Sequence, residues 1–290
     1  MNKSKILKVD FVGGLCNKLF DLFAICDIAI KNKIQIADPL FGWPKKDVYF
    51  SEIYDLDFFN NEMRKLNNDK NIIISKDDFS NYEIIDNNQY KLGEYSQNIL
   101  RNQREKYNMN KECMNIIVLK YLKLNSKYDY ILDKYNMEKT AFHIRIENDW
   151  RQYATYKKVP KNETLLIDVR KLFRMFRKSD IDENNIFFTI GMAHEKLSSF
   201  LKSNNFSPEY FFDKNYKYEV NAAINFELCC RAKNFIGISR STFSNLVTLK
   251  RYLLGNDKSY IYNYKDSIYK REDKGLHCEA EKSIKNVDII

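Results

Sequence analysis

Short apolar runs alternate with amphipathic stretches from the start of the chain. Residues 6–12 form an apolar run that predicts a strand, and the turn 13–17 leads into residues 18–31, whose apolar positions recur with helical spacing. A second apolar run, residues 34–38, follows directly. A strand, a helix and a second strand in this order predict a βαβ unit, which begins a doubly wound parallel sheet.

The middle of the chain is less regular. Pro39 and Pro44 indicate a loop, and residues 71–75 predict a short strand. Residues 110–134 carry an apolar stripe at helical spacing. We therefore predict one helix there, which connects the first half of the chain to the second.

From Lys139 onward the alternation of strands and helices resumes. The predicted strands are residues 140–146, 185–190, 209–212 and 234–238, and the predicted helices are residues 162–178, 195–203, 222–232 and a segment from about 244 to 254. This order predicts an α/β protein of two domains that face each other across a cleft. We place the domains at residues 1–135 and 136–290, with the final helices returning to the first domain.

Composition narrows the class of protein. The 290 residues are 44% hydrophobic and 14% aromatic, which excludes an intrinsically disordered chain. A net charge of +9 would suit nucleic acid, an anionic membrane or an anionic small substrate. Because the lysines are scattered and no RRM or zinc finger is present, we do not expect nucleic acid as a partner.

Cysteine spacing and hydropathy predict the cellular setting. The six cysteines lack the Cys-x-x-Cys spacing of a zinc site, and the chain is too large for a disulfide scaffold. The first residues lack the apolar core of a signal peptide, and no apolar run approaches the roughly 20 residues of a membrane span. We therefore expect a cytoplasmic protein without a transmembrane segment.

Candidate chemistry lies in three loops that each follow a predicted strand. In the first loop, Gly13 and Gly14 permit a ligand to approach the backbone in front of helix N–H groups. The loop lacks both the full dinucleotide-binding pattern and the P-loop pattern. An ordinary turn between a strand and a helix is therefore an equal alternative.

The second loop ends the predicted strand 140–146. Alternation along this strand would place His143, Arg145 and Glu147 on one side. The planar guanidinium of Arg145 could bind a diphosphate through two hydrogen bonds. A half-exposed edge strand with one charged face would give the same pattern.

The third loop, residues 239–244, offers hydroxyl and N–H groups at a predicted helix N-terminus, where anions bind. Serine and threonine are also ordinary helix caps, and capping is the better explanation of this loop taken alone. The carboxylate pairs Asp55 with Asp57 and Asp180 with Asp182 follow no clear strand, so we interpret them as solvated loops and predict no metal site.

Together the three loops resemble motifs of the fucosyltransferase superfamily that uses GDP-fucose, and most closely those of the protein O-fucosyltransferases. The resembling segments are Gly13-Gly14-Leu15-x-Asn17, Ala37-Asp38-Pro39-Leu40-Phe41-Gly42-Trp43, Phe142-His143-Ile144-Arg145-Ile146-x-x-Asp149-Trp150 and Phe235-Ile236-Gly237 with Ser241-Thr242-Phe243-Ser244 and Lys250-Arg251. The resemblance implies a GT-B-like fold of two facing Rossmann-like domains. It also implies an inverting glycosyltransferase that needs no cofactor or metal, with the glycan or protein acceptor on the first domain and GDP-fucose on the second.

The resemblance also implies roles for single residues. Arg145 would bind the β-phosphate and stabilise the charge of the departing GDP. Asn17 would lie beside the reacting sugar, next to the Gly13-Gly14 turn. The other implied substrate-binding residues are His143, Asp149, Asn225, Ser241, Thr242, Phe243 and Ser244, with Asn225 at a position where the family often has Asp.

The general base stays open at this point. Asp21, Glu147 and Asp149 are candidates, and departure of GDP driven by Arg145 with little base assistance is an alternative. Two other functions compete with fucosyl transfer. One is a catalytically idle relative that binds a nucleotide sugar or a glycan, and the other, less favoured, is a basic nucleic-acid-binding protein.

Overall fold

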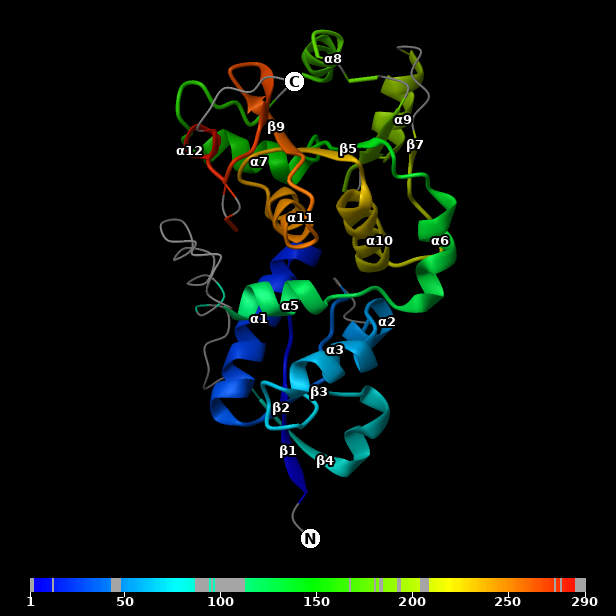
Figure 1. The fold of residues 1–290 in the computed structure, drawn as a ribbon, viewed down its shortest axis with the longest axis vertical. Coiled ribbons are helices and arrows are strands. Elements are labelled where there is room, and N and C mark those ends of the chain that lie inside the picture. The colour runs from blue at the N-terminus through cyan, green and yellow to red at the C-terminus, as the bar shows by residue number, and fades with distance from the viewer. Residues whose placement is uncertain are drawn as a thin grey trace. The chain divides into compact units, whose positions relative to one another are not determined.

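The computed structural model in Figure 1 describes most of the chain. The described residues are 3–11, 13–42, 48–86, 94, 96, 113–166, 168–179, 181–182, 185–191, 194–203, 209–273, 275–276 and 278–284, with the backbone alone at Val169, His194, Lys196, Leu197 and Phe200. Trp43, Pro44 and Asp180, which the sequence analysis singled out, lie outside them. Within the described part, no helix has both the length and the apolar character needed to cross a bilayer.

The chain folds into two compact units. Each unit combines two stretches of chain, Met1–Leu132 with Lys214–Ala223 in the first unit and Asp133–Asp213 with Ile224–Ile290 in the second. Two helices, α6 (Asp129–Lys134) and α10 (Tyr218–Arg231), have residues in both units. The domains predicted from the sequence, 1–135 and 136–290 with returning final helices, stay a prediction.

The first unit holds a four-stranded sheet in the order β3-β2-β1-β4, in which all neighbours are parallel. Its strands are β1 (Ser4–Lys8), β2 (Gln35–Ala37), β3 (Ile73–Ile74) and β4 (Tyr82–Asp86). The predicted βαβ unit is present. Strand β1 lies earlier than predicted because the chain beyond Lys8 makes only an isolated bridge, between Asp10 and Leu40, among the described residues.

Helix α1 (Leu15–Asn32) connects β1 to β2 and is the central helix of the first unit. It contacts β2 on one side and α5 (Met114–Tyr121) on another, which explains why its side chains are buried on most faces. It ends at Lys33, whose left-handed backbone (φ 55°) directs its N–H back to Ala29 and Ile30. Other helical elements of the first unit with described bounds are α2 (Phe50–Ile53), α3 (Leu56–Arg64), η1 (Lys76–Asn81) and η3 (Ser126–Tyr128).

The single helix predicted over residues 110–134 is wrong. The structure has α5, then an extended segment, then η3 and α6. In the extended segment, Leu124 forms a bridge with Tyr54, and the Asn125 N–H donates to the Ile53 carbonyl at 3.0 Å. These hydrogen bonds to a distant segment replace the helical ones, and the apolar stripe could not reveal them.

The second unit holds a six-stranded sheet in the order β10-β9-β8-β5-β6-β7. Its strands are β5 (Thr140–His143), β6 (Ile186–Thr189), β7 (Glu209–Tyr210), β8 (Asn234–Gly237), β9 (Ser259–Tyr264) and β10 (Ser267–Lys270). All neighbours are parallel except β9 and β10. Numbered from β5, this order is 3-2-1-4-5-6, the order of the dinucleotide-binding Rossmann sheet, and it reverses between β5 and β8.

Helices connect the parallel strands of this sheet. They are α7 (Asn148–Tyr156) and α8 (Val169–Arg177) between β5 and β6, α9 (His194–Ser203) between β6 and β7, α10 between β7 and β8, and α11 (Thr242–Leu253) between β8 and β9, with α12 (Ala280–Ser283) near the end (Figure 1). The main core contains Phe142 of β5, Phe176 of α8 and Phe188 of β6. Phe142 contacts both other rings, at centroid distances of 4.9 and 6.3 Å.

Two predicted elements of this unit need correction. The predicted strand 140–146 ends at His143, and helix α7, which the sequence analysis missed, begins five residues later. The predicted helix 162–178 begins only at Val169, because Asp168 caps it: its carboxylate accepts the Arg170 N–H at 2.7 Å. The chain before Asp168 instead runs beside β9, where Glu163 bridges Tyr264.

Candidate functional site

The second sheet has its topological switch point between β5 and β8, and polar residues gather at the carboxyl ends of these strands. Ligands of open α/β sheets bind at this kind of position. His143 is the last residue of β5, and residues 238–244 lead from β8 into α11. The structure therefore brings the second and third predicted loops together.

His143 joins the two strand ends. Its Nδ1 lies 2.8 Å from the Ser244 Oγ, which also accepts the Ile238 N–H at 3.1 Å. The imidazole is buried and packs against the Phe243 ring, with 4.5 Å between the ring centroids and an angle of 39° between the ring planes.

Burial, reinforced by the nearby positive charge of Arg145, holds the pKa of His143 well below its usual range. The ring is therefore neutral at physiological pH and acts as a hydrogen-bonding spacer rather than a cation. Gly237, the last residue of β8, makes this packing possible. A Cβ at Gly237 would lie 2.6 Å from the Ser244 Oγ and 2.7 Å from its Cβ.

Arg145 lies beyond the end of β5 and is held by two carboxylates. Its Nε donates to Glu147 at 3.0 Å, and its Nη2 donates to Asp149 at 2.9 Å. Its guanidinium carbon lies 4.7 Å from the ring centroid of Trp150, in cation–π contact. The predicted alternation of His143, Arg145 and Glu147 along one strand face is wrong, since β5 ends at His143. The two charged residues are placed by these contacts instead.

Glu147 and Asp149 differ in their surroundings. The Glu147 side chain is only 11% exposed, and its Oε1 accepts the Gly191 N–H at 2.6 Å while its Oε2 accepts the Ile146 N–H and Arg145. The Asp149 side chain is 74% exposed, and its hydrogen bonds within the described part of the chain come from the Trp150 N–H and Arg145. Glu147 is thus a fixed support for Arg145, and Asp149 is an exchangeable partner.

Trp150 is itself anchored. Its indole Nε1 donates to the Leu165 carbonyl at 2.9 Å, and the ring stacks on Tyr153 at 5.2 Å between centroids. Because the indole is fixed at both its polar and its apolar surface, it provides a rigid platform beneath Arg145.

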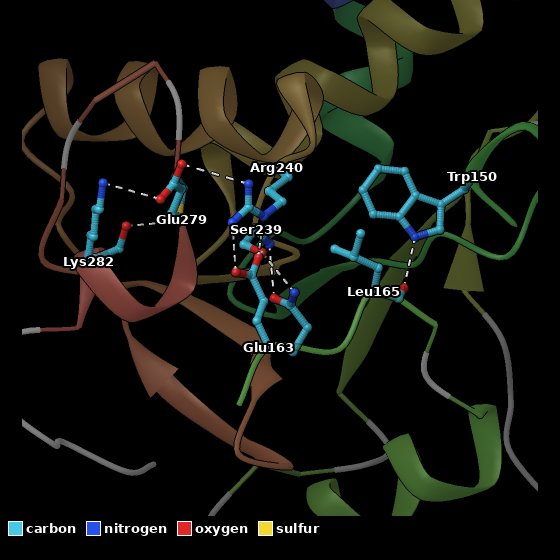
Figure 2. Close-up of polar contacts among 10 residues, drawn as sticks. Trp150, Glu163, Leu165, Ser239, Arg240, Glu279 and Lys282 are labelled. Atoms are coloured by element: carbon cyan, nitrogen blue, oxygen red, sulfur yellow. Dashed lines mark hydrogen bonds and ion pairs between the residues drawn. The ribbon is translucent and has the colours of Figure 1, made fainter. Parts of the chain in front are cut away.

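A buried network holds the third loop. Glu163 accepts two hydrogen bonds from Arg240, at 2.8 Å to Nε and 3.1 Å to Nη2, and one from the Ser239 hydroxyl. The Asn263 side chain bonds the Ser239 backbone N–H at 3.0 Å and its hydroxyl at 2.8 Å. Figure 2 shows Glu163 beside Ser239 and Arg240, with Glu279 on the other side of Arg240. The loop is therefore fixed before any ligand binds.

This loop ends in an uncapped helix. Ser241 is the N-cap residue of α11, but its side chain makes no capping hydrogen bond. Its hydroxyl is buried and has no hydrogen-bond partner among the described residues. Thr242 and Phe243, the next two residues, are partly exposed. Unsatisfied N–H groups, the helix dipole and a hydroxyl group together form a site suited to an anion.

The first predicted loop lies in the first unit. Gly13 has φ 87°, the left-handed region that favours glycine, and Gly14 precedes the first turn of α1, where the Asn17 side chain is exposed. The next residue, Lys18, is buried and forms an ion pair of 2.7 Å with Glu219, and its Nζ also donates to the Phe41 carbonyl. Desolvation lowers the pKa of Lys18 despite this partner.

Asn225 is buried in α10, and its Nδ2 donates to the Phe211 carbonyl at 3.0 Å. This bond attaches α10 to the segment that follows β7. Asp21 is also buried, on the inner side of α1. Asp55 caps α3 by accepting the Phe58 N–H at 3.0 Å, and Asp57 lies exposed in the first turn of α3. The pair therefore belongs to a helix start and not to the solvated loop that we predicted.

Sequence reasoning missed Glu163, Gly191 and Arg240, which hold the site without belonging to its motifs. Gly191 follows a predicted strand in a chain with only eight glycines, a signal that could have indicated it. Arg251, matched to the last motif, is structural: its guanidinium is buried and donates to the carbonyls of Cys229, Cys230, Ala232, Lys233 and Lys258.

All six cysteines are free thiols, and five of them are buried. Cys229 and Cys230 lie in the core, in agreement with their apolar pattern. Over the described ranges no group of three or more His, Cys, Asp or Glu side chains is arranged to hold a metal ion.

Comparisons with known proteins place the fold. No protein-family model and no curated protein sequence matches the chain. Among solved structures, POFUT1 in its apo form is 12% identical, with a TM-score of 0.59 over 90% of this chain and 98% of that chain. POFUT1 in complex with GDP-fucose is 12% identical, with a TM-score of 0.56 over 87% of this chain and 94% of that chain. NodZ, a fucosyltransferase from Bradyrhizobium co-crystallised with GDP, is 11% identical, with a TM-score of 0.52 over 91% of this chain and 96% of that chain.

These likenesses show the fold. The chain has the α/β architecture of GT-B fucosyltransferases, as the resemblance of its motifs implied.

Proposed function

We propose that the protein is a cytoplasmic, metal-independent, inverting glycosyltransferase that transfers fucose from GDP-fucose to a hydroxyl group of a glycan or protein. The observation that carries the proposal is the pairing of an oriented arginine, Arg145, with the uncapped N-terminus of α11 at the switch point of a Rossmann-type sheet. Both features recognise a diphosphate. The complexes of POFUT1 with GDP-fucose and of NodZ with GDP support this choice of donor.

The proposed reaction uses these groups to stabilise departing GDP. The β-phosphate lies at the start of α11, where Ser241, Thr242 and the first N–H groups donate to it. Arg145 exchanges Asp149 for a phosphate oxygen while its Nε stays on Glu147. The bond from fucose C1 to the phosphate oxygen breaks, and its electron pair stays with GDP. The acceptor oxygen bonds C1 from the opposite face and releases its hydroxyl proton to solvent water.

The remaining predicted residues take supporting places. Neutral His143 holds Ser244, and so fixes α11 against the end of β5. Phe243, partly exposed over the imidazole, offers an apolar surface to the donor sugar. Gly13, Gly14 and Asn17 of the first unit are proposed contacts of the sugar and the acceptor. Asn225, bonded to Phe211, is proposed to support the donor site rather than to read the guanine.

The candidates for the general base rank differently once their contacts are known. Glu147 accepts hydrogen bonds on both oxygens, and Asp21 is buried on α1. Asp149 is exposed but binds Arg145. We therefore propose that the departure of GDP, driven by Arg145 and α11, supplies most of the catalysis, with little assistance from a base.

Calorimetry and turnover test the proposal together. We expect GDP and GDP-fucose to bind and UDP to bind far more weakly, and we expect GDP-fucose to be consumed in the presence of an acceptor or slowly hydrolysed without one. Arg145→Ala should lower kcat/KM by about 100-fold or more, in the range of losing one donor to a developing charge. Arg170→Ala, which removes an exposed arginine of α8, is the matched control. Unchanged turnover in Arg145→Ala would refute the proposed role.

One observation favours a second candidate function. Both carboxylates beside Arg145 are engaged by it, as they would be in a protein that only binds a nucleotide sugar. GDP binding of the expected strength without release of GDP from GDP-fucose, across several glycan and peptide acceptors, would support this idle relative.

A further inference from the structure

We propose that Glu163 is a positioning residue for the diphosphate site, and that the segment 163–165 aligns both walls of that site. The first wall is the loop that leads into α11, and the second wall is Arg145 on the Trp150 ring. The chemistry of the ligand rests on the proposed function. The positioning role rests on hydrogen bonds between described residues. The segment 163–165 that makes these bonds belongs to none of the sequence motifs.

The first contact is the carboxylate of Glu163. Its side chain is 0% exposed, and it accepts hydrogen bonds from Arg240 Nε, Arg240 Nη2 and the Ser239 hydroxyl. Glu163 and these two residues are more than 70 positions apart in the sequence. A buried carboxylate with three donors from one loop fixes both the position and the direction of that loop.

The loop held by Glu163 has an unusual backbone. Arg240 has φ 63°, a left-handed conformation that residues other than glycine rarely adopt, and its N–H donates to the Cys278 carbonyl at 2.9 Å. Such a conformation persists only where the surroundings over-determine it. The turn at Arg240 sets the direction in which Ser241 enters α11. Glu163 therefore controls the aim of the first N–H groups of this helix.

The same contacts make Arg240 unavailable as an anion ligand. Its side chain is only 5% exposed, and its guanidinium faces Glu163 in a bidentate pair. An arginine beside a Ser-Thr helix start would ordinarily be interpreted as a phosphate ligand. Here it transmits the position of Glu163 to the loop instead.

The second wall is reached two residues later. The Leu165 carbonyl accepts the indole N–H of Trp150 at 2.9 Å, and Trp150 supports Arg145. Between these contacts, the Thr164 N–H donates to the Asn263 carbonyl at 2.9 Å. Figure 2 shows Glu163 and Leu165 on the same strand-like segment, one bonded toward Ser239 and Arg240 and the other toward Trp150. A shift of this segment would therefore move both walls.

The test compares Glu163→Gln with Glu227→Gln. Glu227 is also a largely buried carboxylate with two cationic partners, Lys250 at 2.9 Å and Arg231 at 3.3 Å. It lies on α10, and these partners belong to the last turns of α11 and α10 rather than to the loop before α11. The amide introduced by Glu163→Gln would direct N–H groups toward the donors of Arg240, which breaks the bidentate pair while the shape of the side chain is kept.

Affinities for GDP, guanosine and inorganic pyrophosphate separate positioning from general destabilisation. For Glu163→Gln we expect the Kd of GDP and of pyrophosphate to rise at least tenfold, with that of guanosine unchanged. For Glu227→Gln we expect all three values to stay within twofold of wild type. An equal loss for guanosine and GDP, or equal effects of the two substitutions, would overturn the inference.

Two further measurements keep the outcomes distinct. If Glu163→Gln does not fold, Ser239→Ala removes one of the three donors to Glu163 and should raise the pyrophosphate Kd by a smaller factor; no change would contradict the inference. A wild-type protein that binds pyrophosphate but not GDP would overturn the proposed function and leave the inference to be decided by pyrophosphate. A wild-type protein that binds neither would overturn both.

Discussion

A single methyl group placed at Gly191 is expected to disable Arg145 without touching it. Gly191 follows β6, and its N–H donates to the Glu147 Oε1 at 2.6 Å. The Cβ of an alanine there would lie 2.4 Å from that same oxygen, a distance that no real contact permits. The glycine is needed for this close approach and not for its backbone conformation, since its φ is not in the left-handed region.

The size of the effect follows from what gives way. The clashing atom is the end of a flexible side chain, so Glu147 rotates and the steric strain is small. The rotation breaks the bond to Gly191 and displaces the oxygen that orients the Arg145 Nε at 3.0 Å. Losing a charge-assisted hydrogen bond costs about 1.5–3 kcal/mol. In a chain of this size we expect Tm to fall by several degrees. Misplacing the arginine by about 1 Å should lower kcat/KM by roughly 10- to 100-fold.

A double-mutant cycle tests the route of the effect. Gly191→Ala, Glu147→Ala and the double variant are compared by GDP release from GDP-fucose and by thermal unfolding. If the methyl group acts through the carboxylate, Gly191→Ala has little further effect once Glu147 is an alanine. Additive losses, or wild-type turnover in Gly191→Ala alone, would refute the reasoning.

Three other predictions concern charge and burial. Because folding lowers the pKa of His143, the stability that comes from its neutral form is fully present above about pH 6.5 and is lost as the pH falls below that value, by up to about 1.4 kcal/mol per pH unit. Urea unfolding from pH 7.5 to 5 should show this slope, and His143→Gln should flatten it. Arg251→Met leaves five carbonyl groups without their buried donor, so we expect the free energy of unfolding to fall by about 3 kcal/mol or more, while the folded fraction keeps its affinity for GDP. A loss below about 1 kcal/mol would contradict the structural role of Arg251. Asp149→Asn removes the charge of the exposed carboxylate that a phosphate must replace on Arg145, so we expect GDP to bind more tightly, by at most about fivefold. Weaker binding of GDP would mean that Asp149 contacts the nucleotide.

The sequence predicts the layout of the fold well where single elements bury one continuous face. Short apolar runs predict β5 and β6, and the Ser-Thr segment before an apolar stretch predicts the start of α11. Strand β9 was missed because it is rich in tyrosine, whose ring is largely buried while its hydroxyl makes the run look mixed. Strand β10 was missed because it has only four residues, of which Ile268 and Tyr269 are buried. The break after α5 depends on hydrogen bonds to a segment about 70 residues away, which periodicity does not record.

Local rules of sequence predicted the residues that gather at the switch point but not the residues that support them. His143, Arg145 and Ser241 stand at strand ends or a helix start, where local rules apply. Glu163 and Gly191 act through contacts with residues 44 to 77 positions away. A lone glutamate in the sequence carries no pattern that reveals such a partner. The position of Gly191 after a predicted strand marks the glycine, but only the folded chain identifies its partner.

The ion pairs at the switch point bear on how a chain with a net charge of +9 would hold the anion site that we propose. Arg240 is fully matched by Glu163, and Arg145 is matched by Glu147 and Asp149, so the resting site has no concentrated positive charge. Attraction then depends on geometry: a helix start that no side chain caps, and an arginine whose one exposed partner can leave. A rigid buried carboxylate under each arginine keeps both in place during that exchange. Under the proposed function, the site would therefore select a diphosphate of the right shape rather than any polyanion, because a scattered lysine surface offers charge without this orientation.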